Sequence, residues 1–341
     1  MEIFPKTLGS RPRLAVELRP EGIVAARAED TSAVLSAVAY APLPTGALAI
    51  GLKAGNVVDG SRVVTGLREV LDAVAGRASD RNRNVTIIVP DAAVRVLLLE
   101  FDTLPTKPAE ALAVVRFRLK KLLPFDSDHA AVSYQVMSSE KNSMRVLVVA
   151  MPDEVLSEYE SMVGEAGYRA GVVLPSTLAA LAGLEEQQQS TALIVNAGQG
   201  GITTAIVRAG VLLLHRSLEL ENEVAAGEEA GGQDLRSGMG YESTMQAKVL
   251  ASVEAAMTGR EIAQTVSVAV AYFEDNLGHA PGAIFSAGPL GADGLKAILE
   301  ENGFERSEVK ELVKAEALAA SAATGRVQLS WLAGVRGALK D

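Results

Sequence analysis

The chain contains no cysteine and few aromatic or histidine residues. Of its 341 residues, 4% are aromatic, one is tryptophan and three are histidine. The absence of cysteine excludes disulfides, thiolate metal sites and cysteine nucleophiles. The histidines, His129, His215 and His279, lie far apart and lack the spacing of metal ligands. The sequence therefore predicts no metal site, and no constellation of residues in it predicts a catalytic centre.

Excess positive charge and an export signal are also missing. Lys and Arg number 32 against 42 Asp and Glu, a net charge of −10, which argues against nucleic acid as the main partner. Residues 1–13 lack the apolar stretch of a signal peptide. The longest uncharged run, 31–52, contains Pro42, Pro44 and Gly46, so it predicts a strand, a turn and a loop instead of a membrane span. We expect a cytoplasmic protein.

Aliphatic residues dominate what is present. Hydrophobic residues make up 48% of the chain, and since so few are aromatic, the core must consist mainly of Ala, Val, Leu and Ile. This composition favours an α/β protein with buried strands. The length corresponds to about two domains.

The most informative motif is a glycine-rich turn between two apolar runs. Residues 192–196 and 202–208 are predicted strands, and 197–201, Ala-Gly-Gln-Gly-Gly, is a predicted tight turn between them. Glycines allow positive φ and leave backbone N–H groups exposed, which is how many proteins bind phosphate. A second strand-to-glycine junction follows at 283–291. Two such junctions in this order predict a nucleotide cleft closed from two sides.

In the first half, the segment 92–152 is predicted to form a compact strand–helix–strand–strand unit. Its helix is predicted to open at Pro108 and to end at Pro124. One face of that helix carries Leu112, Val115, Leu119 and Leu122. Strands are predicted at 131–137 and 144–150, with a polar loop at 138–143.

The second half contains a long predicted helix from 244 to 277, with a break near Gly259. A closing helix is predicted at 327–339. The polar segment 185–190 predicts a linker, and the acidic, glycine-rich segment 221–240 predicts a loop. Since each half begins with a β-hairpin, near residues 13 and 192, the sequence indicates an internal duplication.

The order of these motifs is similar to that of the actin-like ATPase superfamily and, within it, of the PilM family of type IV pilus assembly proteins. The segments that carry the resemblance are 104–136, 145–155, 165–167 and 332–337. It implies an α/β, actin-like two-lobed fold with ribonuclease H-like halves and an inserted strand–helix–strand subdomain. The implied boundaries are 12–91 and 153–188 for the first lobe, with helix 327–341 packing back on it, 92–152 for the inserted subdomain, and 189–326 for the second lobe.

The resemblance also implies a nucleotide site built from three segments. In the first, the family's aspartate corresponds to Glu17, Arg19 stands where glycine is usual, and Pro20 lacks a backbone donor. In the second, Asn196 replaces the carboxylate that would organise Mg²⁺. The implied ligands are ATP and Mg²⁺, with weak or no hydrolysis. The candidate binding residues are Glu17, Arg19, Asn196, Gly198, Gly200, Gly201, Ser286, Gly288 and Gly291.

The function implied by the resemblance is that of a scaffold. PilM-like proteins hold the N-terminal cytoplasmic tail of an inner-membrane pilus protein, PilN, so we expect a PilN-like partner, a peptide groove between the first lobe and the inserted subdomain, and contact with pilus motor ATPases. The chain would be cytoplasmic and peripheral at the inner membrane. Alternatives are a type II secretion scaffold resembling GspL, a small-molecule kinase of the same superfamily, and a cell-division actin homologue.

Overall fold

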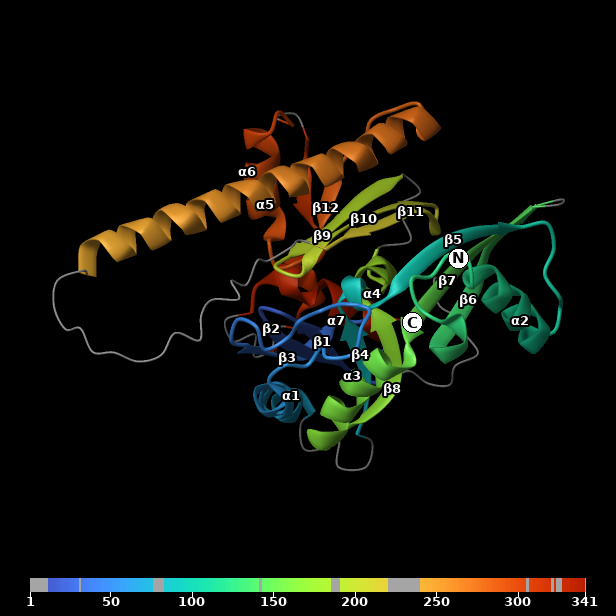
Figure 1. Ribbon diagram of the computed structural model, residues 1–341, viewed down its shortest axis with the longest axis horizontal. Coiled ribbons are helices and arrows are strands. Elements are labelled where there is room, and N and C mark those ends of the chain that lie inside the picture. Colours follow the sequence, from blue (N-terminus) through green and yellow to red (C-terminus); the bar gives the residue numbers. More distant parts are fainter. Residues whose placement is uncertain are drawn as a thin grey trace.

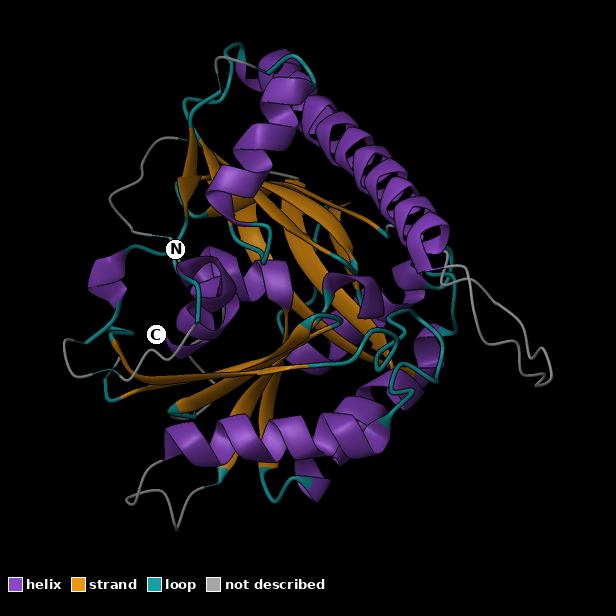
Figure 2. Cartoon of the chain, turned by 90° about the vertical axis from the view of Figure 1, so that its left-hand side faces the viewer, coloured by secondary structure: helices purple, strands orange, loops and turns teal. Residues whose placement is uncertain are grey.

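The computed structural model describes residues 12–30, 32–75, 83–140, 143–184, 191–219, 240–304, 307–319, 322 and 327–340, with the backbone alone described for 240–257. Two five-stranded sheets face each other (Figures 1 and 2). The sheet of the first lobe has the order β3-β2-β1-β4-β8, and that of the second lobe has the order β11-β10-β9-β12-β13.

The strands of the first sheet are β1 (Leu14–Arg19), β2 (Gly22–Ala28), β3 (Leu35–Pro42), β4 (Asn84–Val89) and β8 (Arg169–Pro175). Those of the second are β9 (Ala192–Gly198), β10 (Gly201–Arg208), β11 (Val211–Leu218), β12 (Ile284–Ser286) and β13 (Val309–Glu311). In each sheet the first three strands pair antiparallel and the other two add in parallel. This repeated order is the internal duplication that the two hairpins predict.

Between β4 and β8 the chain forms a third, antiparallel sheet of order β5-β7-β6, which lies to one side of the two lobes (Figure 1). Its elements are β5 (Arg95–Phe101), helix α2 (Pro108–Leu119), the 3₁₀ turn Ser127–His129, β6 (Ala130–Glu140) and β7 (Ser143–Pro152). The inserted subdomain implied by the resemblance is therefore present. The exact residue boundaries predicted for the three units stay a prediction.

Two details of the inserted subdomain differ from the sequence prediction. Helix α2 ends at Leu119, so Leu122 lies beyond it and is 47% exposed instead of continuing the buried face. Strands β6 and β7 continue through most of the predicted loop 138–143, because a register shift after Val136 lets the pairing resume at Ser138.

Helices cover both outer sheet faces. Helices α1 (Gly60–Ala75) and α3 (Asp153–Glu165) pack on the first sheet. Helices α5 (Gly240–Leu277) and α6 (Gly291–Glu301) pack on the second. Helices α4 (Ser176–Ala182) and α7 (Ala333–Leu339) contact each other and the first sheet, on its side facing the second lobe (Figure 2). The short 3₁₀ turns Asp91–Ala93, Ala315–Ala317 and Leu329–Leu332 complete the described elements.

Helix α5 is continuous through Gly259, so the predicted break is wrong. A glycine inside a helix costs only about 1 kcal/mol relative to alanine. Gly259 also packs against α6, since a Cβ added to it would lie 3.8 Å from the side chain of Ile298. The predicted closing helix is shorter than expected, because residues 329–332 form a 3₁₀ turn before α7. The predicted linker 185–190 and nearly all of the predicted loop 221–240 lie outside the described residues. None of the helices in the described ranges has the length and apolar character needed to cross a bilayer.

Helices α4 and α7 cross at very short range. Gly337 of α7 makes this possible, because a Cβ there would collide with the carbonyl oxygen of Ala179 in α4 and would lie 2.9 Å from the backbone nitrogen of Gly183. One turn earlier, a Cβ on Gly334 would overlap the carboxylate of Glu17. Helix α7 therefore needs glycine at both positions, and its backbone lies directly against α4 and the end of β1.

Candidate functional site

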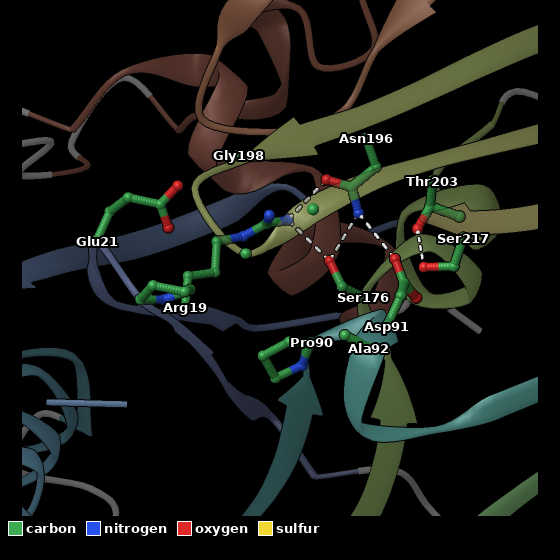
Figure 3. Close-up of a pocket in the computed structure, with 13 residues that line it drawn as sticks. Arg19, Glu21, Pro90, Asp91, Ala92, Ser176, Asn196, Gly198, Thr203 and Ser217 are labelled. Atoms are coloured by element: carbon green, nitrogen blue, oxygen red, sulfur yellow. Dashed lines mark hydrogen bonds between the residues drawn. The ribbon is translucent and has the colours of Figure 1, made fainter. Parts of the chain in front are cut away.

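The candidate site lies between the lobes, where β1, β4 and β8 of the first sheet and β9 of the second sheet end. Because β1, β4 and β8 are parallel, their ends meet at one edge of the first sheet, which is where open α/β sheets bind ligands. Pocket-lining residues come from the turns after β1 and β4, the start of α4 and the hairpin β9–β10 (Figure 3). The space open to the centres of water-sized molecules is about 40 Å³, room for a few waters.

Arg19 crosses this cleft. Its Nη2 lies 2.6 Å from the Glu17 carboxylate, donates to Ser176 Oγ at 2.7 Å, and donates to Asn196 Oδ1 at 3.1 Å (Figure 3 for the last two). The arginine is 8% exposed. Because Glu17 and Arg19 belong to the first lobe and Asn196 to the second, a single guanidinium group links the lobes.

Glu17 is fully buried and does not line the pocket. Its Oε1 accepts from Ser176 Oγ at 2.6 Å and pairs with Arg19, while Oε2 has no hydrogen-bond partner. Burial raises the pKa of this carboxyl, and Arg19 partly opposes that shift. The counterpart of the family's first-segment aspartate is therefore committed to an internal ion pair.

Asn196 is the centre of the hydrogen-bond network. Its Nδ2 donates to Ser176 Oγ and to Thr177 Oγ1, both at 2.9 Å, and lies 3.4 Å from Asp91 Oδ2. Its Oδ1 accepts from Arg19. This arrangement uses both ends of an amide, and an aspartate at the position could not donate. The amide that departs from the hydrolytic pattern thus fits its surroundings.

Sequence reasoning missed Asp91, Ser176 and Thr177. Asp91 follows β4, and both of its oxygens accept from Thr177, Oδ1 from the backbone N–H at 3.1 Å and Oδ2 from the hydroxyl at 2.5 Å. The signal was available, since Asp91 follows a buried strand and Ser176 opens a helix after another. Asp91 is a cleft carboxylate that a kinase would use as a base, and its oxygens already accept from Thr177.

The glycine hairpin lies against the turn after β1. Gly198, Gly200 and Gly201 all line the pocket. The backbone N–H of Gln199 donates to Glu21 Oε1, and a Cβ on Gly198 would approach that oxygen to 2.6 Å. Gly201 has φ +146°, and a Cβ there would lie 2.5 Å from the carbonyl oxygen of Leu218. The predicted turn is present, and a carboxylate of the chain itself occupies one of its N–H groups.

The third predicted segment is near the hairpin but outside the pocket lining. A Cβ on Gly288 would lie 2.7 Å from Asn196 Oδ1, so this segment packs directly behind Asn196. Ser286 is buried at the end of β12. Gly291 has φ +70° at the start of α6, where Glu311 Oε1 accepts the N–H of Ala292 at 2.7 Å. The structure thus brings Arg19, Asn196 and the hairpin glycines together, and separates Ser286 and Gly291 from them.

His215 of β11 is a further group near the site that sequence reasoning left unassigned. Its Nε2 is buried without a hydrogen-bond partner. Burial lowers the pKa of the imidazole, and the charge of Asp91 opposes this shift. The ring is therefore neutral at neutral pH.

These contacts do not fit a bound Mg²⁺–ATP. A cation site needs free oxygen ligands, but Glu17 is paired with Arg19 and position 196 is a neutral amide. In the described ranges, no group of three His, Cys, Asp or Glu side chains is arranged to hold a metal. A phosphate site needs free N–H groups, and that of Gln199 is bonded to Glu21.

The two lobes, each with the same five-strand order, and the inserted sheet define the actin-like two-lobed fold. A chain of the solved PilM–PilN type IV pilus biogenesis complex has this arrangement, with a TM-score of 0.71 and 19% identity over 96% of this chain and 98% of that one. The resemblance to PilM is thereby confirmed at the level of the fold.

Two other solved structures superpose more loosely. One is the cytoplasmic domain of EpsL, an inner-membrane component of the type II secretion system of Vibrio cholerae, with a TM-score of 0.46 and 11% identity over 96% and 92% of the two chains. The other is the ethanolamine utilization protein EutJ from Carboxydothermus hydrogenoformans, with a TM-score of 0.47 and 11% identity over 97% and 91%. Neither agreement is close enough to support an argument. No protein-family model and no curated protein matches the sequence.

Proposed function

We propose that this chain is a cytoplasmic actin-like scaffold of type IV pilus assembly. The observation that carries the proposal is the end-to-end similarity to a chain of the PilM–PilN complex, at a TM-score of 0.71. The self-bonded cleft supports a scaffold over an enzyme, since its polar groups hold each other instead of facing a substrate. Its partner would be the N-terminal cytoplasmic tail of a PilN-like inner-membrane protein, which keeps the chain at the membrane. Contact with pilus motor ATPases would extend the same role.

The tail would lie between the first lobe and the inserted subdomain, beside helix α3, which contacts β8 of the first lobe and β6 and β7 of the subdomain. Strand β6 is an edge of its sheet among the described strands, since only β7 pairs with it. An exposed edge offers backbone N–H and C=O groups to an extended peptide, and alternate side chains give specificity. Val136, 37% exposed on β6, is a suitable probe of this edge.

The test is fluorescence anisotropy with labelled tail peptides from inner-membrane pilus proteins encoded beside this chain. We expect saturable micromolar binding that Val136→Lys weakens by at least tenfold. Val268→Lys is the matched control, because Val268 is comparably exposed, at 40%, but lies on α5 of the second lobe. Failure of every pilus tail would overturn the proposal, and binding of a type II secretion tail alone would establish the alternative scaffold.

A further inference from the structure

The three places assigned to a nucleotide by resemblance each hold a charged side chain of this chain. The first is the cation position. Arg19 Nη2 lies 2.6 Å from Glu17 and donates to Asn196 of the other lobe at 3.1 Å. A guanidinium group is always protonated, and here it contacts the two side chains that would face a metal. Figure 3 shows it extended across the cleft toward Asn196.

The second place is the glycine turn. Glu21 comes from the turn between β1 and β2 in the first lobe, and its carboxylate accepts the N–H of Gln199 in the second. Gly198 leaves room for that carboxylate, since a Cβ would approach it to 2.6 Å. Accepting N–H groups from a glycine turn is the interaction by which such turns bind phosphate. Here a carboxylate of the chain supplies a negative charge to the turn.

The third place is the start of α6. Glu311 from β13 accepts the N–H of Ala292 at 2.7 Å. Gly291 packs beside it, since a Cβ added to Gly291 would lie 3.3 Å from Glu311 Oε1. An acidic group is favourable at a helix N-terminus because it meets the positive end of the helix dipole. Here too a carboxylate of the chain occupies the donor.

We propose that the cleft carries its own ligands: Arg19 takes the place of the cation and Glu21 the place of a phosphate group, and together they hold the two lobes closed without nucleotide. Both links run from the first lobe to the second, so each opposes separation of the lobes. Because Arg19 and Glu21 hold the positions of the cation and of a phosphate group, a nucleotide enters only after both links break.

This arrangement fixes the angle between the lobes independently of ATP. A ligand shifts a conformational equilibrium only by its differential affinity for the two states. Side chains tethered in the cleft compete at very high effective concentration with any nucleotide in solution. The surface that a partner meets is therefore constant and is not switched by ATP.

The absence of native cysteine allows a direct test of the lobe angle. Glu69→Cys on α1 and Ala297→Cys on α6, both exposed and on opposite lobes, take a pair of nitroxide labels. Pulsed electron paramagnetic resonance then gives the distance distribution with and without millimolar ATP and Mg²⁺. We expect one narrow distribution that nucleotide does not change, and no ATP binding by calorimetry.

The links are then removed one at a time. Arg19→Ala and Glu21→Ala are each expected to broaden the distribution toward longer distances. Arg118→Ala, at an exposed arginine of α2, is the matched control and is expected to leave it unchanged. Arg19→Ala leaves the buried Glu17 carboxylate without its cation, so this variant could fail to fold. The double variant Glu17→Gln with Arg19→Met removes both charges, and the lobe distance is then measured in it instead.

Two results would overturn the proposal. One is micromolar ATP binding by the unmodified cleft with a shift in the distance distribution. The other is an unchanged distribution in Glu21→Ala and in the double variant. Neither result depends on the tail-binding partner, so this test is separate from that of the proposed scaffold function.

Discussion

Replacing Gly337 by alanine tests whether the close crossing of α4 and α7 holds the first lobe together. The added Cβ would collide with the carbonyl oxygen of Ala179 and lie 2.9 Å from both the carbonyl carbon of Ala179 and the nitrogen of Gly183. All three obstacles are backbone atoms, so no side chain can rotate away. Helix α7 must move off α4, and because α7 also contacts β1, the movement spreads into the sheet. Over-packing in a core costs about 1–3 kcal/mol, and we expect the upper end, about 3 kcal/mol.

The assay is urea unfolding followed by the fluorescence of Trp331. This is the one tryptophan of the chain. It lies in the 3₁₀ turn just before α7 and packs edge-on against Tyr40, with ring centroids 4.8 Å apart. The signal therefore reports the region that the substitution disturbs. A loss of about 3 kcal/mol changes the folding equilibrium by about a hundredfold and lowers the urea midpoint accordingly.

The matched control is Gly164→Ala in α3, the same change in another helix. Gly164 is exposed and has no atom within 4 Å of the position of an added Cβ. Alanine there gains helix propensity, and we expect stabilisation of about 0.5 kcal/mol. The reasoning is refuted if the two substitutions change the midpoint in the same direction, or if Gly337→Ala leaves it unchanged.

Three further predictions concern the cleft and its surroundings. Asn196→Asp removes two donated hydrogen bonds and places a carboxylate beside Asp91, so we expect a loss of about 2–4 kcal/mol in urea unfolding without a gain of ATP binding. Burial lowers the pKa of His215, so the unfolded chain takes up the proton first and the native protein should lose stability relative to His215→Gln as pH falls below its ordinary pKa of 6.5. Burial raises the pKa of Glu311 in the folded protein. The contribution of this side chain to folding stability is therefore complete below the carboxyl's unfolded pKa and is lost as pH rises through the folded pKa. Relative to Glu311→Gln, the native protein should gain stability on acidification from pH 7. Unfolding midpoints measured across pH 5 to 7 check both signs.

Much of the fold was predictable because its strands are short apolar runs bounded by turn residues. Both starting hairpins and the glycine turn at 197–201 follow directly from the apolar runs and the turn residues between them. The failures have physical causes. Gly259 looks like a break in isolation, but it packs on Ile298. The three-residue strand β13, which was not predicted, owes its existence to pairing with β12.

The site was only half predictable. The resemblance identifies Glu17, Arg19 and Asn196 as candidate residues, and the structure brings them together where β1 and β9 end. Their pairing with each other is not visible in the sequence, since Arg19 and Asn196 are 177 positions apart. Glu21 also gave no signal, as a glutamate in a turn next to a proline is ordinary solvent-facing chemistry until the second lobe closes over it.

The pair of Glu17 and Arg19 limits how this sequence can vary. A metal could reach the Glu17 carboxylate only if the arginine were lost. Losing the arginine first leaves a fully buried carboxylate unpaired, and losing the glutamate first leaves a buried cation without its partner; breaking such a pair costs about 3–5 kcal/mol. Either residue can therefore be lost alone only at a large cost in the free energy of unfolding. We expect related sequences to keep these two residues together or to lose them together.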